Sequence, residues 1–556
     1  MTQAVRPSIE GHADLVLHGA AGFTGLARWA GPMSVAVREG RIQAVGGEDV
    51  LALVGPRTEV VDLRGRMLLP GFVDAHIHAV WGAVEAGRCA LADLSGLDEY
   101  LAALDRYARS YPDIGWIKGG GWRMSDVPPE GPRAADLDAV VSDRPVFLWS
   151  KDAHQGWANS RALALAGIGS STADPPGGRI GRLADGEPSG ALYERAIDLV
   201  TAVMPREAHA DLVDAVYRAQ RELHALGIVA WQDAIVARNH DEGDPADAYL
   251  EVERAGGLTA RVIGALWWDR TVGREQIDQL VERRARYSSG RLRCSTVKIM
   301  QDGIVEARSA SVLVPYLDPE LPEGQRHGTS FVLSDLLVDA LVALDAEDFD
   351  VHLHTIGDRA VREALDAIAA ARAANGPRDA RHQLAHVQLV DPADLQRFAE
   401  LGVIANIQPY WATRQKLMVE HTMPLLGAPR NTRQYPFGDL WRAGAVLAAG
   451  SDWPVSTPDP LTGIHVAVNR MMVPGHRGEG APPFFPEQAL PLEVALRAYT
   501  SGAAQALHLG DLGRIEAGVP ADLVVLDRDL FETPSDELGL ARVEATFVDG
   551  VRVYSV

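Results

Sequence analysis

Two histidines, His76 and His78, stand two residues apart where an apolar run beginning at Phe72 ends. Residues at positions i and i+2 of a β-strand lie on the same face, so a strand here would point both imidazoles the same way. Two neutral imidazoles side by side are suitable ligands for a first-row transition metal. Taken alone, the pattern could also be a chance pair of histidines in a loop. The rest of the chain distinguishes a metal site from such a pair.

Eight short apolar runs, the first of which carries this histidine pair, are spaced along the middle of the chain. The stretches between them include helix-like segments at 359–374 and 392–400. Eight strand–helix units predict the α/β class and a (β/α)8 TIM-like barrel. The predicted strands are Phe72–His76, Ile228–Asp233, Arg261–Leu266, Val297–Gln301, Val351–His354, Gln383–His386, Val403–Ile407 and Val446–Ala449.

Polar residues fall at the ends of several of these predicted strands. Catalytic groups of such barrels lie at the C-terminal ends of the strands, so these side chains should gather at one face. A lysine that ends a buried strand is costly to keep charged, so the pKa of Lys298 should be low. An ion pair with Asp302 or Glu306 is the alternative for this lysine. The strand-end residues are His76, His78, Lys298, His354, His386 and Asp452.

Both ends of the chain are rich in short strand-like runs. Residues 13–67 and 521–554 share this texture, and the turn pair Asp549-Gly550 separates two of the runs. We therefore expect one β-sandwich that is built from both termini and lies beside the barrel. The expected division is a composite sandwich at 1–67 and 508–556 and a barrel domain at 68–507.

The connection after the first barrel strand, at about 80–206, is unusually long. Ordinary connections of this kind have only about 2–6 residues, so we predict an inserted subdomain. It contains strand-like runs at 116–118 and 146–149 and a turn-rich stretch at 174–178. Because it leaves the barrel at the catalytic face, this insertion is placed to act as a lid.

The composition narrows the classes of partner. The chain has 556 residues and a formal net charge of −22, which argues against nucleic acid and anionic membranes as partners. No window approaches the roughly 18 apolar residues of a spanning helix. Cys89 and Cys294 suggest no disulfide framework, and Met1–His18 lacks a signal-like apolar run. We expect a cytoplasmic enzyme with a small-molecule substrate.

Five segments carry motifs that are weak singly and specific in combination: Gly71–His78, Asp152–Ser160, Val297–Gly303, His354–Ala360 and Gly450–Val455. In this order they resemble the amidohydrolase superfamily, and more narrowly its YtcJ-like branch (amidohydrolase family 3), which includes the N-substituted formamide deformylases. The resemblance covers nearly the whole chain, including the two-ended sandwich. It is also compatible with a homodimer.

The resemblance implies a metal site made of the strand-end residues. One ion would be held by His76, His78 and Asp452 and a second by His354 and His386, with a carboxylated Lys298 as the bridging ligand. His352 is a competing candidate, but the family motif attaches to the histidine before Thr-Ile-Gly-Asp. Zn²⁺ is expected because it favours imidazole and carboxylate ligands. Mn²⁺, Fe²⁺ and Co²⁺ stay open, as does the number of ions, one or two.

Two residues are candidates for catalysis. As a one-oxygen ligand, Asp452 would keep an oxygen free to take a proton from the attacking water and return it to the leaving nitrogen; a helix N-cap is its alternative role. His154 would stabilise the oxyanion or hold the substrate carbonyl, or else be structural.

Aromatic residues on segments expected at the catalytic face suggest a pocket for an apolar or aromatic substituent, with core packing as the alternative. They are Trp81, Trp122, Trp157, Trp411 and Trp453.

The function expected from the resemblance is metal-dependent hydrolysis of a linear amide-type C–N bond, in an N-acyl or N-formyl compound, by metal-activated hydroxide. The alternative is the same fold acting on a cyclic amide, a carbamate or an ester, or as a deaminase. Deaminases of the superfamily usually work with one metal and lack the strand-end lysine, so Lys298 counts against deamination. A binding protein with an inactive metal site is a third interpretation, which the full set of ligands argues against.

Overall fold

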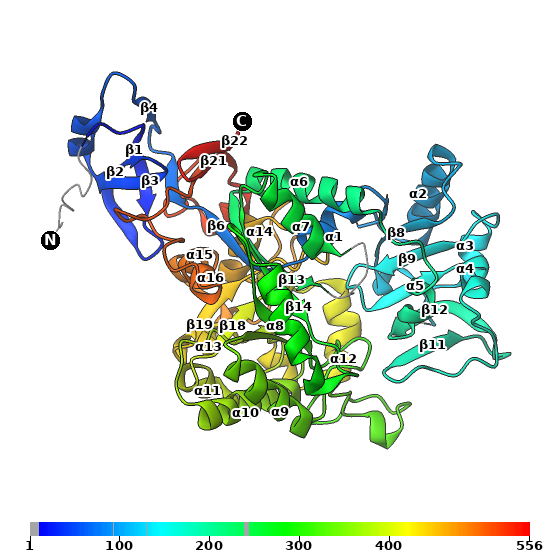
Figure 1. Cartoon of the computed structure of the whole chain (residues 1–556). Coiled ribbons are helices and arrows are strands. Elements are labelled where there is room, and N and C mark those ends of the chain that lie inside the picture. The colour runs from blue at the N-terminus through cyan, green and yellow to red at the C-terminus, as the bar shows by residue number, and fades with distance from the viewer. Residues whose placement is uncertain (1–10, 93, 129, 238–243, 477) are drawn as a thin grey trace.

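A barrel of eight parallel strands forms the centre of the computed structural model, which describes residues 11–92, 94–128, 130–237, 244–476 and 478–556. The strands follow one another around the barrel in the order of the chain (Figure 1). Every predicted barrel strand is present. Their bounds are β6 (Phe72–Ile77), β13 (Ile228–Val236), β14 (Arg261–Trp267), β15 (Leu292–Met300), β16 (Asp350–Thr355), β17 (Gln383–His386), β18 (Ile404–Ile407) and β19 (Val446–Ala449).

Helices between the strands cover the outside, which confirms the predicted α/β barrel. The helix expected at 359–374 is α10, and the one expected at 392–400 is a 3₁₀ turn followed by α11. Within the described residues, no helix is long and apolar enough to cross a membrane. The main helices are α1 (Ala79–Glu85), α6 (His209–Ala225), α7 (Pro245–Arg254), α8 (Ile277–Arg286), α9 (Ser334–Ala346), α10 (Asp358–Asn375), α11 (Leu395–Glu400), α13 (Phe437–Arg442), α14 (Pro460–Asn469), α15 (Leu492–Ala498) and α16 (Ser501–Ala506).

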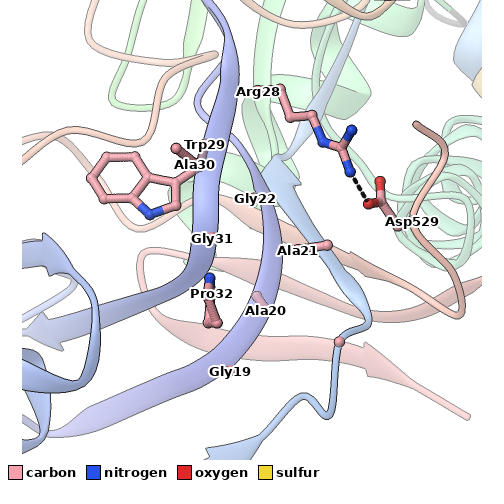
Figure 2. A pocket seen from close by; sticks show the side chains of 11 residues that line it. Gly19, Ala20, Ala21, Gly22, Arg28, Trp29, Ala30, Gly31, Pro32 and Asp529 are labelled. Atoms are coloured by element: carbon pink, nitrogen blue, oxygen red, sulfur yellow. Dashed lines mark hydrogen bonds and ion pairs between the residues drawn. The ribbon is translucent and has the colours of Figure 1, made fainter. Parts of the chain in front are cut away.

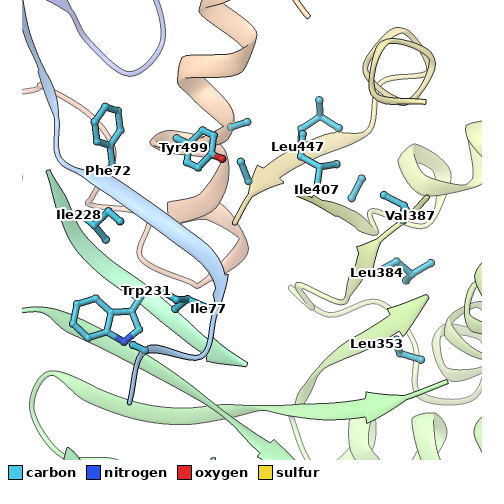
Figure 3. Packing of buried hydrophobic residues seen from close by; sticks show 14 of the residues in the cluster. Phe72, Ile77, Ile228, Trp231, Leu353, Leu384, Val387, Ile407, Leu447 and Tyr499 are labelled. Carbon is cyan, nitrogen blue, oxygen red and sulfur yellow. The ribbon is translucent and has the colours of Figure 1, made fainter. Parts of the chain in front are cut away.

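Alternation along the strands separates two environments in the barrel. Outward-facing side chains such as Leu353, Leu384, Ile407 and Leu447 pack into the main apolar core between strands and helices (Figure 3). Their immediate neighbours face the barrel axis, because successive residues of a strand point to opposite faces. Many of these inward residues are polar and buried: Lys298, His352, His354, Gln383 and Asn406. The strand period therefore places the chemistry inside the barrel.

The barrel closes where its first strand, β6, meets the end of its last, β19. The Asp452 amide donates to the His76 carbonyl at 2.7 Å, and the His78 amide donates to the Trp453 carbonyl at 2.9 Å. Gly450 is needed at this seam, since a Cβ there would lie 2.5 Å from the His76 nitrogen. The closing seam and the predicted ligands of the first ion therefore coincide.

The β-sandwich expected from both termini takes the form of one mixed sheet beside the barrel, made of strands from both ends of the chain. In it β20 (Leu523–Leu526) pairs antiparallel with β5 (Met67–Pro70), and residues of both ends share a core. The domain boundaries at 67/68 and 507/508 stay predictions, and residues 1–10 lie outside the described part of the chain. The other strands are β1 (Leu15–Phe23), β2 (Arg28–Arg38), β3 (Arg41–Gly46), β4 (Glu59–Asp62), β21 (Val543–Val548) and β22 (Val551–Ser555).

An open hollow lies in this terminal sheet, between β1 and β2 (Figure 2). Apart from Trp29 its lining is mostly glycine, alanine and proline, and its two charged side chains, Arg28 and Asp529, form an ion pair at 2.8 Å. No histidine or cysteine is among the described residues that line it. The hollow therefore offers neither a ligand cluster nor a nucleophile.

The long connection between α1 and α6 folds around a sheet of its own, on the side of the barrel away from the terminal sheet (Figure 1). The strands expected at 116–118 and 146–149 are β8 and β9. The elements of this insertion are β7 (Cys89–Ala90), α2 (Leu97–Ser110), β8 (Ile117–Trp122), α3 (Ala134–Asp138), β9 (Val146–Ser150), β10 (Gln155–Ala158), α4 (Ser160–Leu165), β11 (Gly178–Arg182), β12 (Pro188–Glu194) and α5 (Ile197–Thr201). Its predicted limits at about 80–206 stay a prediction.

Candidate metal centre

Two imidazoles and a carboxylate converge at the closing seam of the barrel. His76 Nε2 and His78 Nε2 each lie 3.2 Å from Asp452 Oδ1. One ligand atom from each residue lies within 4.8 Å of the other two. The structure thus brings together the residues predicted for the first ion, and their two nitrogens and one oxygen match donors that Zn²⁺ accepts.

The backbone around this cluster is held in an unusual conformation. Asp452 has a φ of 56° and His386 a φ of 76°, a region that residues other than glycine rarely adopt. Such strain costs about 1–3 kcal/mol per residue and persists where the surroundings enforce it, often at functional sites. Asp74 is one such support, because its carboxylate accepts from the His76 amide at 3.0 Å and the Ser451 amide at 3.1 Å.

The second predicted pair, His354 and His386, lies beside the first cluster. Their ring centroids are 4.5 Å apart, and the His386 ring is 4.8 Å from the His76 ring. Asp302 orients His354 by accepting from its Nδ1 at 3.1 Å, which leaves Nε2 free. Nδ1 of His386 is buried and finds no hydrogen-bond partner among the described residues. A buried orphan nitrogen beside other imidazoles suits a cation site.

Burial sets the charge of these groups. It lowers the pKa of His76, His354 and His386 well below the ordinary value, so the rings are neutral and their lone pairs are free. Burial alone would raise the pKa of Asp452, but the hydrogen bond and charge of His78 outweigh it and the pKa is lowered. The cluster therefore combines neutral imidazoles with an ionised carboxylate, as cation binding requires.

Lys298 lies near the end of β15 inside the barrel and is 1% exposed. Burial lowers its pKa to about 8, although the Asp452 carboxylate acts in the opposite direction. Its two alternative partners are engaged elsewhere, Asp302 by His354 and Glu306 by Thr422. Across the described residues, no ion pair reaches the Lys298 amine, so the ion-pair alternative does not describe this structure.

His352 lies behind His76 and away from the ligand atoms. Its Nε2 is 2.8 Å from His76 Nδ1, whereas His76 Nε2 is the nitrogen that faces Asp452. His352 is therefore placed as a hydrogen-bond partner of His76, and the choice of His354 over His352 as a ligand stays a prediction.

The insertion contributes one histidine to this end of the barrel. The His154 ring centroid lies 5.7 Å from that of His354. Its Nδ1 is 3.0 Å from Glu194, which also accepts a hydrogen bond from Ser309 of the barrel at 2.5 Å. Burial would lower the pKa of His154, but Glu194 and then Asp152 raise it to about 9, so the ring is an imidazolium at pH 7.

Three of the five candidate tryptophans lie near the cluster. The Trp81 ring is 5.6 Å from the His78 ring, and Trp411 stacks on His386 at 5.4 Å and 24°. Trp453 directly follows Asp452. All three are only partly buried, so each has surface that a bound molecule can contact.

The other two, Trp122 and Trp157, lie in the core of the insertion. Both are fully buried, with ring centroids 6.0 Å apart. Their indole N–H groups donate to the backbone carbonyls of Leu148 and Arg133. This arrangement matches the core-packing alternative.

The residues that orient these groups were not identified from the sequence. Glu194 is 40 positions from His154 and lies outside all five motif segments. Asp302 lies within the segment Val297–Gly303 but was considered only as a partner for Lys298. The sequence does offer a signal for Asp302, since it is an acidic residue inside a strand-end motif and could orient a nearby ligand. Glu194 has no comparable signal in the sequence.

A parallel eight-stranded barrel whose strand ends gather buried imidazoles, a lysine and a carboxylate defines the class of metal-dependent hydrolase barrels. The comparison with protein families makes this specific. The chain belongs to the amidohydrolase family, whose model Amidohydro_3 matches residues 59–554. The resemblance inferred from the sequence motifs is thereby confirmed.

Individual relatives match over almost the full length of the chain. It is 30% identical to the Bacillus subtilis (strain 168) protein YtcJ over 545 residues, covering 97% of this chain and 99% of YtcJ. It is 29% identical to N-substituted formamide deformylase of Arthrobacter pascens, covering 97% and 98%. An uncharacterised metal-dependent hydrolase of Pyrococcus furiosus has a similar structure, with a TM-score of 0.70 and 26% identity over 93% of this chain and 99% of that one.

Proposed function

We propose that this protein is a metal-dependent amidohydrolase that cleaves a linear amide-type C–N bond in an N-acyl or N-formyl compound. The observation that carries the proposal is the convergence of His76, His78 and Asp452 at the closing seam, beside Lys298. The relative named N-substituted formamide deformylase supports the bond type. Trp81, Trp411 and Trp453 would provide the wall for an apolar or aromatic substituent.

The donor set fits one or two divalent cations, with Zn²⁺ preferred. One ion would be held by the seam residues and a second by His354 and His386, whose orphan Nδ1 is otherwise unexplained. When bound, such cations polarise a carbonyl and activate water at neutral pH. The insertion would help to shield a small-molecule substrate from bulk water, because it brings His154 to 5.7 Å from His354, measured between ring centroids.

Asp452 is assigned the proton transfer. Its Oδ1 faces both seam histidines, which leaves Oδ2 for a proton. The carboxylate takes a proton from the attacking water and returns it to the departing amine nitrogen. His154 is assigned the substrate carbonyl, because an imidazolium can donate a hydrogen bond to the oxygen as negative charge develops there.

Lys298 is proposed to carry a carbamate, formed when its neutral amine captures carbon dioxide. The buried amine without a carboxylate partner supports this assignment. The Lys298→Ala variant should lose at least one metal ion, and small carboxylic acids such as propionate should restore part of the activity. Metal content is measured by elemental analysis. Unchanged metal content with no rescue would contradict the carbamate.

A panel of substrates tests the function as a whole. Metal-free enzyme and enzyme reloaded with Zn²⁺, Mn²⁺ or Co²⁺ are assayed on linear formamides, N-acyl amines, cyclic amides, carbamates, esters and ammonia-releasing amines. We expect metal-dependent release of amine from the linear compounds, with aromatic substituents preferred. Preferred turnover of esters or cyclic amides, or release of ammonia, would favour the alternative substrates on the same fold.

A further inference from the structure

A layer of buried polar side chains lies inside the barrel beneath His76. The interior of such barrels is ordinarily filled by branched apolar residues, so polar residues at this level require an explanation. They hydrogen-bond to one another and come from β13 and from the three consecutive strands β16, β17 and β18, with Gln408 just after β18. The layer consists of Gln232, His352, Gln383, Asn406 and Gln408, each 0% exposed.

His352 connects this layer to the candidate metal cluster. Its Nε2 lies 2.8 Å from His76 Nδ1, and His76 Nε2 faces Asp452 at 3.2 Å. A neutral imidazole carries one proton, so His76 can offer the Nε2 lone pair only while its proton is on Nδ1. His352 must then accept that N–H with an unprotonated Nε2.

The other ring nitrogen of His352 meets two side-chain amides that favour different tautomers. Gln383 Oε1, an acceptor, lies 3.1 Å from His352 Nδ1, and Gln232 Nε2, a donor, lies 2.6 Å from it. The orientation of each glutamine amide follows from a backbone carbonyl beside it. A carbonyl only accepts hydrogen bonds, so the amide nitrogen must face it. Gln383 Nε2 donates to the Ala506 carbonyl at 3.2 Å, and Gln232 Nε2 donates to the Ala75 carbonyl at 3.1 Å.

We propose that His352 is the positioning residue that selects the metal-binding tautomer of His76, and that Gln383 and Gln232 act on it in opposite directions. When His352 donates from Nδ1 to Gln383, its Nε2 accepts from His76 Nδ1 and leaves His76 Nε2 free. When Gln232 donates to His352 Nδ1, the proton of His352 is on Nε2 and is donated to His76 Nδ1. His76 then carries its own proton on Nε2, the nitrogen that faces Asp452. Each ring keeps one proton in both states, so the exchange requires no net charge.

This inference rests on the proposed metal site, and its readout is metal affinity. The His352→Leu variant removes the acceptor and should weaken Zn²⁺ binding, measured by competition with a chelator, about 10–100-fold. His352→Gln should recover much of the affinity, since its Oε1 can accept from His76 Nδ1. His224→Leu is the matched control, because His224 is also buried and hydrogen-bonded through both ring nitrogens but does not touch the cluster.

The two glutamines give the sharper test, because they should act with different signs. Gln383→Met should weaken Zn²⁺ binding, whereas Gln232→Met should preserve or strengthen it. Thermal unfolding of the metal-free proteins is measured in parallel, since a loss of packing would affect both variants alike. If His352→Leu fails to fold, His352→Gln and this glutamine pair carry the test.

The outcomes separate this inference from the metal site on which it rests. Equal weakening in both glutamine variants, or wild-type affinity in a folded His352→Leu variant, would overturn the role of His352. A wild-type protein that binds no divalent metal would contradict the metal site itself.

Discussion

The barrel supplies buried histidines and the insertion supplies one partly buried histidine to the same place, yet these rings differ in charge. His76 and His386 lie among other imidazoles and near Lys298, and burial together with these neighbours lowers their pKa well below the ordinary value. His154 lies against Glu194 and near Asp152, which raise its pKa to about 9 in spite of burial. Burial alone therefore does not decide the charge of a histidine; the sign of its neighbours does.

This contrast divides the proposed chemistry between the two regions. A neutral imidazole can bind a metal cation, whereas an imidazolium can stabilise negative charge that develops on a substrate oxygen. The barrel supports its proposed ligands through Asp74 and Asp302, whose carboxylates accept hydrogen bonds from backbone amides. The insertion holds His154 through Glu194, and Glu194 is in turn held by Ser309 of the barrel. Orientation of His154 therefore depends on contact between the two regions.

The largest effect is expected from removing a neutral ring of the barrel. The His76→Ala and His78→Ala variants should lose bound metal and fall to background turnover, because each removes a proposed ligand that faces Asp452. Metal content and turnover are measured on the same preparations. Full metal with normal turnover in either variant would remove that histidine from the ligand set.

Asp452→Asn should separate metal binding from proton transfer. The amide keeps one oxygen for the metal but accepts no proton, so kcat should fall about 10²–10⁴-fold while most metal is retained. In the wild type the lowered pKa keeps Asp452 ionised until the pH falls below 3.8. The acidic limb from this group should therefore lie below that pH. Near-normal kcat in the Asn variant would move the proton transfer to another group.

A smaller effect is expected from the charged ring of the insertion. His154→Leu should lower kcat/KM about 10²-fold, as for loss of one oxyanion donor. A raised pKa means that the imidazolium is present below about pH 9 and is lost above it, so the wild type should lose activity as the pH rises through that value.

Glu194→Gln removes the charge that raises the pKa of His154 and should shift this alkaline limb to lower pH. Profiles of kcat/KM against pH check both variants. An unchanged limb in Glu194→Gln would show that another group produces it, and would break the contrast between the two regions.

The smallest effect on turnover is expected from the core of the insertion. Trp122→Phe leaves the Leu148 carbonyl without its indole donor and should lower the free energy of unfolding by about 1–3 kcal/mol. Its KM should stay within about twofold of the wild type. Trp411→Phe, which alters the ring stacked on His386, should change KM instead. A large change in KM for Trp122→Phe would make it a pocket residue.

Most of the barrel could be predicted from the sequence because its signals are local. The runs Gln383–His386 and Val446–Ala449 coincide with β17 and β19, since short apolar runs between helices have few other interpretations. The candidate ligands were proposed by the same logic, because polar residues at strand ends stand out against apolar strands. His352 and His354 share one face, so the strand period alone could not separate ligand from supporting residue.

The rest of the site depends on contacts that no local pattern encodes. Glu194 and Ser309 meet only after the insertion packs on the barrel, and they are 115 positions apart. Trp122 and Trp157 show a second limit, since an aromatic residue suits a pocket wall and a core equally well. Only packing shows which of the two surrounds a given ring.

The closing seam also has a consequence for the order in which the protein is made. His76 lies in the first strand of the barrel, Asp452 follows the last strand, and Gly450 between them packs against the His76 backbone. At a synthesis rate of about 5–20 residues per second, Asp452 leaves the ribosome roughly 20–75 s after His76. During that interval the His76–His78 pair is a two-coordinate site with no carboxylate. Metal capture by the complete cluster must therefore be a late event, after most of the chain has been synthesised.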